Sequence, residues 1–241
     1  MVILAGSSQI PLRFAAQSEA SFEDFVVGPN APTVAAVRAA ASQANESWPL
    51  LWGTSGRGKT HLLSAATTLA ATAGRRVAYL AAEVLRTHTP EVLDTLTEMD
   101  LVCLDDIDRL LKEEGWELSL FNLFNRLREQ GAVLIVSSGC QPRSLSVDLP
   151  DLRSRLSWGT TLALRPLGDD DKIELLHRRA RSRGSQIEAE VIRYLMSRER
   201  RTVGYLVAAL DHLIDVGFSE KRRITIPLAR THLGKLKGIK A

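Results

Sequence analysis

The segment from Gly53 to Thr60, GTSGRGKT, has the residue types and spacing of a phosphate-binding loop. Its glycines allow the backbone to curl so that successive N–H groups point at phosphate oxygens, and a helix that begins there adds partial positive charge. A lysine at this spacing reaches the β- and γ-phosphates of a nucleotide, and the hydroxyl that follows it ligates Mg²⁺. We therefore expect a bound nucleotide with Mg²⁺, Thr60 as a metal ligand, and contacts from Gly53, Thr54, Ser55, Gly56, Arg57, Gly58, Lys59, Thr60 and the neighbouring His61.

A pair of carboxylates follows an apolar run farther along the chain. Leu101–Leu104 leads directly into Asp105 and Asp106, the pattern of a Walker B strand. We expect Asp105 to hold Mg²⁺ and Asp106 to act in catalysis by positioning or polarising a water molecule. Many buried strands end in aspartate, but behind a complete phosphate loop this pattern is a strong indication of nucleotide chemistry.

These residues need a scaffold, and the chain alternates short apolar runs with helical patterns. Such alternation favours a parallel sheet covered by helices on both faces. The expected strands are Pro49–Trp52, Val77–Leu80, Leu101–Asp105, Ala132–Ser137 and Thr160–Leu164. The run Val77–Leu80 leaves room for an inserted strand between the loop strand and the metal strand. The expected helices between the strands are Thr60–Ala73, Pro90–Met99 with Thr89 as N-cap, and Trp116–Gln130.

After Pro166 the pattern becomes helical only. We expect helices at 169–183, 188–198, 203–216 and 227–236. The chain then divides into a flexible tail at 1–20, an α/β nucleotide-binding domain at 21–167 and a small helical domain at 168–241. Residues 169–241 carry 16 Lys and Arg against 10 Asp and Glu, although the whole chain has a net charge of only +3. This basic excess fits either a polyanionic partner or solvated helical faces.

The composition excludes several classes of protein. Of the 241 residues, 45% are hydrophobic and 24% are charged, as in an ordinary soluble globular protein. No apolar run approaches the roughly 18 residues that cross a bilayer. Cys103 and Cys140 have neither zinc-site spacing nor disulfide density, so a reducing cytoplasm is the expected location. A secreted protein, a membrane protein and a zinc module are not expected.

Several segments resemble the AAA+ domain of the replication initiator DnaA and its relatives. Phe22–Asn30 resembles the stretch that wraps the adenine in that family, Trp52–Leu63 its phosphate loop, and Leu104–Ile107 its Walker B motif. The resemblance covers residues 9–236 and implies an AAA+ fold, a five-stranded parallel sheet followed by a helical lid domain. It also implies that an adenine nucleotide, ADP or ATP, contacts Phe25, Val26 and Val27.

The segment Leu149–Gly159 is similar to box VII of the same family, which carries an arginine finger. The resemblance implies that Arg155 is this catalytic finger, offered to ATP held by a neighbouring molecule, where it stabilises charge on the transferring phosphoryl group. The residue chemistry alone allows a surface salt bridge from Arg155 to Asp151 equally well. Arg153 is a second candidate on a different face of the helix.

A short motif in the tail resembles the peptide by which proteins dock on the sliding clamp of replication. Its residues are Gln9, Ile10, Leu12 and Phe14, with Pro11 between them. Gln9 offers a donor and an acceptor to a polar pocket, Leu12 and Phe14 fill an apolar cleft, and Pro11 lowers the entropy lost on ordering. The alternative is an apolar tail that packs on its own domain.

Two departures from the family pattern concern the sensor residues. The strand at 132–137 ends in Ser137-Ser138-Gly139, where relatives often have Asp or Asn. The position of the sensor-2 arginine of the lid corresponds to Gly204, with Arg200 and Arg201 just before it, so either the alignment is displaced or the chain lacks this arginine. These departures imply a weak turnover of the chain's own nucleotide.

Within the family, the chain is most similar to the regulatory inactivators of DnaA. The resemblance implies an adapter that binds adenine nucleotide, docks on the DNA-loaded sliding clamp and stimulates hydrolysis of DnaA-bound ATP, so that initiation of replication is negatively regulated. Implied partners are DnaA, the clamp, DNA through the clamp, and a second copy of the chain, in the cytoplasm near the nucleoid. We expect no helix-turn-helix domain after the lid. The rival functions are a DnaA-like or DnaC-like helicase loader with its own turnover, and a small-molecule P-loop kinase, against which the box VII resemblance and the lid helices argue.

Overall fold

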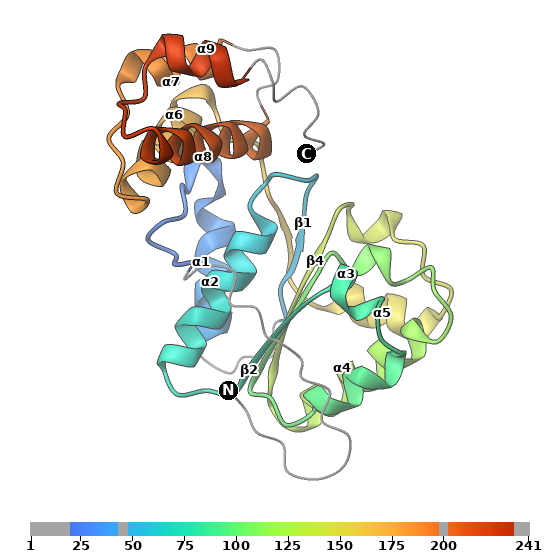
Figure 1. Cartoon of the computed structure of the whole chain (residues 1–241). Helices are drawn as coiled ribbons and strands as arrows, with labels where there is room; N and C mark the ends of the chain where they lie inside the picture. Colours follow the sequence, from blue (N-terminus) through green and yellow to red (C-terminus); the bar gives the residue numbers. More distant parts are fainter. Residues whose placement is uncertain (1–19, 43–47, 198–201, 234–241) are drawn as a thin grey trace.

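The computed structural model describes residues 20–42, 48–197 and 202–233, and its centre is a five-stranded, all-parallel sheet (Figure 1). The strands are β1 (Leu50–Trp52), β2 (Val77–Ala81), β3 (Leu101–Asp105), β4 (Val133–Ser138) and β5 (Thr161–Ala163). They lie in the order β2-β3-β4-β1-β5. This arrangement confirms the predicted five-stranded parallel sheet.

The sheet order differs in one respect from the sequence-based expectation. The strand that separates the loop strand β1 from the metal strand β3 is β4, and β2 lies at the edge. Every residue of β4 is buried, whereas burial alternates along β2. Burial of every residue is typical of a central parallel strand, and burial of alternate residues is typical of an edge. Because β2 is itself a continuous apolar run, VAYLA, this difference could not be inferred from the sequence.

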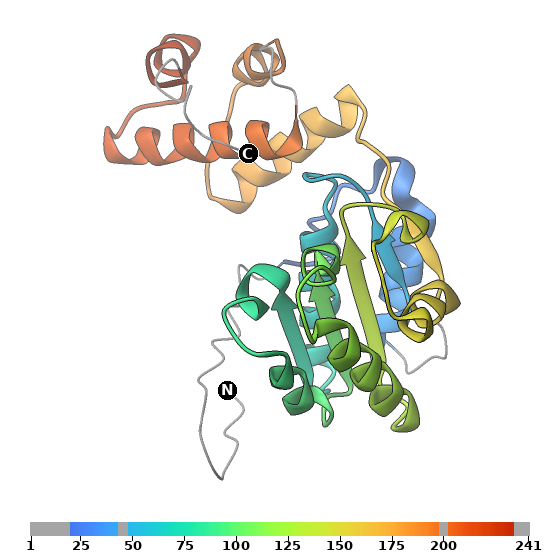
Figure 2. The same ribbon diagram turned by 90° about the vertical axis from the view of Figure 1, so that its right-hand side faces the viewer.

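Helices cover both faces of the sheet, as Figures 1 and 2 show. One face carries α1 (Ala31–Ser42) and α2 (Lys59–Thr72), and the other carries α4 (Trp116–Glu129) and α5 (Pro150–Trp158). Shorter elements complete this part of the chain: α3 (Ala82–Leu85) and the 3-10 turns η1 (Gly28–Asn30), η2 (Pro90–Leu96), η3 (Ile107–Arg109) and η4 (Pro142–Ser144). The helix α1 has no counterpart among the predicted elements.

The helix predicted over Pro90–Met99 forms as the 3-10 segment η2, which ends at Leu96. The Thr89 side chain makes no capping hydrogen bond, and the backbone N–H of Val92 bonds to the carbonyl of Thr89 in the tighter three-residue pattern. Val92, Leu93 and Leu96 are buried in the core cluster that also contains α4 residues. Tertiary packing therefore sets this conformation in place of a capped α-helix.

Four elements after the sheet pack around a second cluster of buried apolar side chains. They are α6 (Asp169–Ser182), α7 (Ala189–Met196), α8 (Val203–Ser219) and α9 (Ile226–Leu233), and they form the helical lid. The apolar stripe of α8 supplies much of this cluster, including Leu206, Leu210 and Leu213. Within the described ranges, no helix combines the length and hydropathy needed to cross a membrane.

The segment before α1 makes hydrogen bonds both to the end of the sheet domain and to the helical lid. The Asn30 side chain donates to the carbonyl of Arg165 at 3.2 Å and accepts from its N–H at 2.8 Å. From the lid, Arg178 donates to the carbonyl of Glu23 at 3.0 Å. Gly28 has a positive φ of 46°, and a Cβ there would lie 2.8 Å from a carboxylate oxygen of Asp171. The segment therefore passes through the junction between sheet and lid.

Candidate nucleotide-binding site

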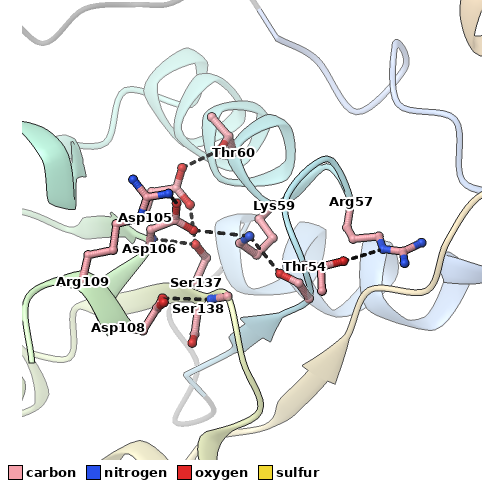
Figure 3. A network of polar contacts seen from close by, with 12 residues as sticks. Thr54, Arg57, Lys59, Thr60, Asp105, Asp106, Asp108, Arg109, Ser137 and Ser138 are labelled. Atoms are coloured by element: carbon pink, nitrogen blue, oxygen red, sulfur yellow. Dashed lines mark hydrogen bonds and ion pairs between the residues drawn. The ribbon is translucent and has the colours of Figure 1, made fainter. Parts of the chain in front are cut away.

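The phosphate loop lies between β1 and α2, as its sequence predicts (Figure 3). Gly56 and Gly58 have φ values of 77° and 92°, which side chains rarely adopt. A Cβ on Gly58 would also lie only 2.7 Å from the ring of Phe25. The loop thus curls against the segment that the sequence assigns to the adenine side, and glycine is required at its last turn.

The side chain of Lys59 lies across the loop, and only 6% of the residue's surface is exposed. Its Nζ donates to the carbonyl of Gly53 at 2.9 Å and lies 3.3 Å from Oδ1 of Asp106, as Figure 3 shows. Asp106 is half-buried, has a positive φ of 56°, and also faces Arg109 at 3.6 Å. The ammonium group is therefore held at the position where a phosphate charge would be met.

Asp105 is buried and accepts hydrogen bonds from three hydroxyl groups. Thr60 donates to Oδ2 at 2.6 Å, Tyr79 donates to the same oxygen at 2.9 Å, and Ser137 donates to Oδ1. Burial, and secondarily the charge of Asp105, raises the pKa of Tyr79 well above its ordinary value, so the phenol remains a donor. The three donors fix both carboxylate oxygens.

The adjacent oxygens of Thr60 and Asp105 fit a Mg²⁺ site. Mg²⁺ prefers hard oxygen ligands, and in nucleotide sites one or two protein ligands usually share it with phosphates and water. The described residues hold no group of three or more His, Cys, Asp or Glu that could bind a metal alone. The available donors therefore suit a metal ion that arrives with a nucleotide.

A pocket of about 520 Å³ lies between the phosphate loop and the lid. Phe25 and Val26 line it, whereas Val27 packs against the core and is not part of the lining. The His61 ring lies 5.5 Å from that of Phe25, and its Nε2 is 2.9 Å from the carbonyl of Ser21. The remaining lining residues include Gly56, Arg57, Gly58, Leu167, Leu175, Val203 and Val207.

The outer part of the loop is more exposed. Arg57 donates from Nε to the Thr54 hydroxyl at 3.1 Å, and Ser55 is exposed to solvent. The backbone N–H of Gly53 donates to the carbonyl of Ser138 at 3.2 Å, which ties the loop to the end of β4. The structure thus brings the predicted phosphate contacts onto one continuous loop; their roles stay predictions.

The sensor positions are occupied by small residues. Ser137 and Ser138 are fully buried at the end of β4, and Ser137 also accepts from the N–H of Asp106 at 2.9 Å. Ser137 therefore holds both Walker B residues, a role that the sequence did not reveal. A Cβ on Gly56 of the loop would lie 3.6 Å from the backbone nitrogen of Gly204 in the lid helix α8, so α8 approaches the loop at a residue that has no side chain. Arg200 and Arg201 lie outside the described residues.

The lid contributes arginines to the pocket that the sequence analysis missed. Arg178, Arg179 and Arg183 all line it from α6 or its end. Arg179 makes two hydrogen bonds of 2.9 Å to Asp211, and Arg183 lies 2.7 Å from Asp215. The four-residue spacing of Arg179 and Arg183 on one helical face was the available signal. These ion pairs fix α6 to α8 beside the pocket.

Arg155 lies on α5, on the face of the sheet opposite α2, and so away from its own phosphate loop (Figures 1 and 2). The alternative of a salt bridge to Asp151 has no counterpart among the ion pairs of the described residues; instead, the guanidinium lies over the ring of Trp158. Arg153, the second candidate, donates to the carbonyl of Val147. Among the described residues, the guanidinium of Arg153 donates a hydrogen bond to a backbone carbonyl and that of Arg155 does not.

The predicted clamp-binding residues Gln9, Ile10, Leu12 and Phe14 lie outside the described residues. Their role stays a prediction.

A family model of the bacterial DnaA ATPase domain matches residues 16–163. The chain belongs to the DnaA ATPase-domain family. The lid-domain model of Hda matches residues 169–233, directly after the DnaA match. The chain is thus an Hda-like, DnaA-related AAA+ protein, which confirms the family predicted from the sequence.

Solved structures of DnaA proteins have the same fold. Domain III of the replication initiation protein DnaA from Thermotoga maritima superposes with a TM-score of 0.81 at 22% identity, over 92% of this chain and 98% of that one. AMPPCP-bound DnaA from Aquifex aeolicus has a TM-score of 0.70 at 26% identity, over 85% of this chain and 68% of that one. RuvB of Thermotoga maritima shares the fold more distantly, with a TM-score of 0.68 at 21% identity, over 93% of this chain and 74% of that one.

Proposed function

We propose that the chain is an adenine-nucleotide-binding adapter that, on the DNA-loaded sliding clamp, stimulates hydrolysis of ATP bound to DnaA. Hydrolysis would leave DnaA inactive for initiation, so the adapter acts as a negative regulator of replication. The observation that carries the proposal is the placement of Arg155 in a DnaA-type ATPase domain joined to an Hda-type lid. This arginine lies on α5, on the face of the sheet opposite the helix α2 that follows its own phosphate loop, and among the described residues it has no carboxylate partner.

The chain's own nucleotide, ADP or ATP, would occupy the pocket between loop and lid. The AMPPCP bound by the Aquifex aeolicus relative supports an adenine nucleotide here. Lys59 would exchange its contacts for phosphate oxygens, and Thr60 and Asp105 would hold Mg²⁺, which neutralises phosphate charge when bound. With serines at the sensor 1 position and Gly204 against the loop, we infer that this nucleotide mainly shapes the molecule and is turned over slowly.

The catalytic contribution would be made to the neighbour's nucleotide. When water attacks the γ-phosphorus of ATP, the bond to the ADP oxygen breaks and negative charge spreads over the transferring group. A guanidinium supplied from another molecule stabilises that charge and can raise the rate by about 10³–10⁵-fold. Arg155 is the residue proposed for this role.

The test is hydrolysis of DnaA-bound ATP in the presence of clamp loaded on DNA. The chain should stimulate hydrolysis, and Arg155→Ala should lower the stimulated rate by at least about a hundredfold while nucleotide binding by the variant is retained. Arg153→Ala tests the second candidate, and Arg143→Ala, an exposed arginine of η4, is the matched control that should keep full activity. Equal stimulation by Arg155→Ala and the unmodified chain would refute the finger assignment.

The clamp interaction needs its own measurement. Replacement of Gln9, Leu12 and Phe14 by alanine should abolish binding to the isolated sliding clamp, since the motif supplies both the polar and the apolar contacts. Tethering on the clamp raises the effective concentration of adapter near DnaA, so the same variant should also lose stimulation at low protein concentration. Clamp binding that survives the triple substitution would exclude this motif as the docking site.

A helicase-loader ATPase with its own turnover is the second candidate. The observation in its favour is that the expected phosphate-loop and Walker B side chains lie together, with Asp106 beside Lys59 and Asp105 beside Thr60. Steady-state hydrolysis by the purified chain alone separates the two functions. Fast turnover that Lys59→Ala abolishes would favour the loader.

A further inference from the structure

The surface around Arg155 contains a half-exposed tryptophan that lies between α4 and α5. Trp158 is 50% exposed, a high value for so large an apolar side chain. The guanidinium carbon of Arg128, from α4, lies 3.9 Å from the centroid of its ring. The guanidinium carbon of Arg155, one helical turn before Trp158 on α5, lies 5.8 Å from the same centroid. One indole ring therefore contacts the guanidinium groups of two arginines.

The two arginines contact the ring at very different distances. Attraction between a cation and an aromatic face extends to about 6 Å from the centroid. Arg128 is well within this range and fixes the ring, whereas Arg155 lies near its limit and is held only loosely. Since the two guanidinium groups also repel each other, the outer one is the easier to remove from the ring.

Neither guanidinium has a polar partner among the described residues. No side-chain hydrogen bond or ion pair of Arg128 or Arg155 is present in that part of the chain, although arginines on nearby surfaces, such as Arg126, pair with carboxylates. An arginine that is not paired with a carboxylate can meet a phosphate without first breaking an ion pair. The ring therefore offers Arg155 a resting position that does not compete with an anion.

Helix α5, which carries Arg155 and Trp158, is fixed at its two ends. At its beginning, the carboxylate of Glu117 on α4 accepts from the N–H groups of Asp148 and Leu149, with distances between 2.7 and 3.0 Å. At its end, a Cβ on Gly159 would lie 1.9 Å from the carbonyl oxygen of Trp48, so the chain passes directly over the start of β1. A rigid helix leaves the side chain of Arg155 as the part that can move.

We propose that Trp158 is a positioning residue for Arg155: stacked with Arg128, its ring gives the guanidinium of Arg155 a weak resting contact, with no carboxylate of the described residues bound to it, until the partner's ATP takes it. This inference rests on the proposed function, because it assigns how the finger is presented. It identifies Arg128 as a residue that acts on the reaction through the ring.

The first experiment measures stimulated hydrolysis of DnaA-bound ATP as a function of adapter concentration, with clamp loaded on DNA. Trp158→Leu should lower the maximal stimulated rate by about tenfold, because a misplaced catalytic group loses rate more than binding. The adapter concentration giving half-maximal stimulation should change by less than about twofold. Trp158→Phe should recover part of the rate, since phenylalanine keeps an aromatic face.

The matched control is Phe218→Leu, which removes an aromatic side chain of similar exposure, 58%, from the lid. It should leave both kinetic quantities unchanged. Thermal unfolding of each variant shows that the fold is kept. An unchanged maximal rate in Trp158→Leu, or a loss of rate caused only by weaker association, overturns the inference.

The second experiment needs no partner. In the full chain, the Nε–H resonances of Arg128 and Arg155 should both show ring-current shifts that disappear in Trp158→Leu, with the larger shift for Arg128. Arg128→Gln should change the resonance of Arg155, because the ring is no longer fixed. The absence of any ring-current shift at Arg155 overturns the inference while the proposed function stands.

The two failures are therefore distinguishable. If the unmodified chain does not stimulate hydrolysis, the proposed function fails; if Arg155→Ala stimulates it as well as the unmodified chain, the finger assignment fails and this inference fails with it. If Arg155→Ala is inactive but Trp158→Leu is fully active, only the positioning role is excluded.

Discussion

At the scale of single residues, Gly58 is the point where the phosphate loop packs against the Phe25 segment. Two features exclude a side chain at this position: its φ is 92°, and a Cβ on it would lie 2.7 Å from the ring of Phe25. Gly58→Ala should lower the affinity for an adenine nucleotide at least about tenfold and destabilise the fold by about 2–4 kcal/mol, measured by fluorescent-nucleotide titration and denaturant unfolding. Gly74→Ala is the matched control, because Gly74 has a φ of 78° with no atom within 4 Å of a Cβ. It should cost only the conformational strain, about 1 kcal/mol. Equal effects of the two substitutions would contradict the proposed contact.

Cys103 gives the stability of the protein a dependence on pH. Burial in β3 raises the pKa of this thiol from 9.0 to about 12. The unfolded chain releases the proton above pH 9 while the folded chain keeps it, so stability falls between pH 9 and about pH 12. In this window, one retained proton corresponds to a slope of about 1.4 kcal/mol per pH unit. The free energy of unfolding of Cys103→Ala should fall with pH less steeply by that amount, whereas that of Cys140→Ala should keep the slope of the unmodified chain. Parallel curves for Cys103→Ala and the unmodified chain would contradict the assignment.

The roles of some residues could be inferred from spacing, and those of others could not. Lys59, Thr60 and Asp105 follow from a local pattern, because a loop between strand and helix fixes where their side chains point. Ser137 holds Asp105 and the N–H of Asp106 from a different strand, and this contact exists only once β4 lies beside β3. Val27 was expected at the nucleotide; it packs against the core and does not line the pocket, and its role stays a prediction, since a run of apolar residues does not show which of them faces a pocket.

At the scale of elements, the position of α5 depends on a close approach at Gly159. A Cβ there would lie 1.9 Å from the carbonyl oxygen of Trp48, and backbone atoms cannot move aside cheaply. Gly159→Ala should destabilise the protein by about 1–3 kcal/mol in denaturant unfolding. Gly204→Ala, in α8 with no atom within 4 Å of a Cβ, should leave stability unchanged or raise it by up to about 1 kcal/mol. A neutral Gly159→Ala would show that the end of α5 can shift.

Elements were predictable where a pattern is local and strong. The five strands were placed to within a residue or two because each is a short apolar run between turn residues. The order of strands, the helix α1 and the 3-10 form of η2 were not, because long-range pairing and packing decide them. Helix α1 is rich in alanine, with buried and exposed positions that differ little in hydrophobicity, so its periodicity is weak.

At the scale of the whole molecule, the nucleotide pocket lies between two separate apolar cores. Its lining comes from the loop and the Phe25 segment on one side and from α6 and α8 on the other. ADP with Mg²⁺ at 100 times its Kd should stabilise the fold by about 2.7 kcal/mol and slow amide exchange in lid and sheet together. Lys59→Ala should remove both effects, and Arg143→Ala should keep them. Protection confined to the loop would show that lid and sheet respond independently.

The position of this pocket has a consequence for signalling. On the proposed function, a nucleotide in this pocket would contact both the loop and the lid, and its diphosphate and triphosphate forms would differ in the charge they place beside Lys59. On the proposed function, the orientation of the lid relative to α5 then reports which form is bound. The energy state of the cell would thereby influence how often a chromosome is allowed to begin a new round of copying.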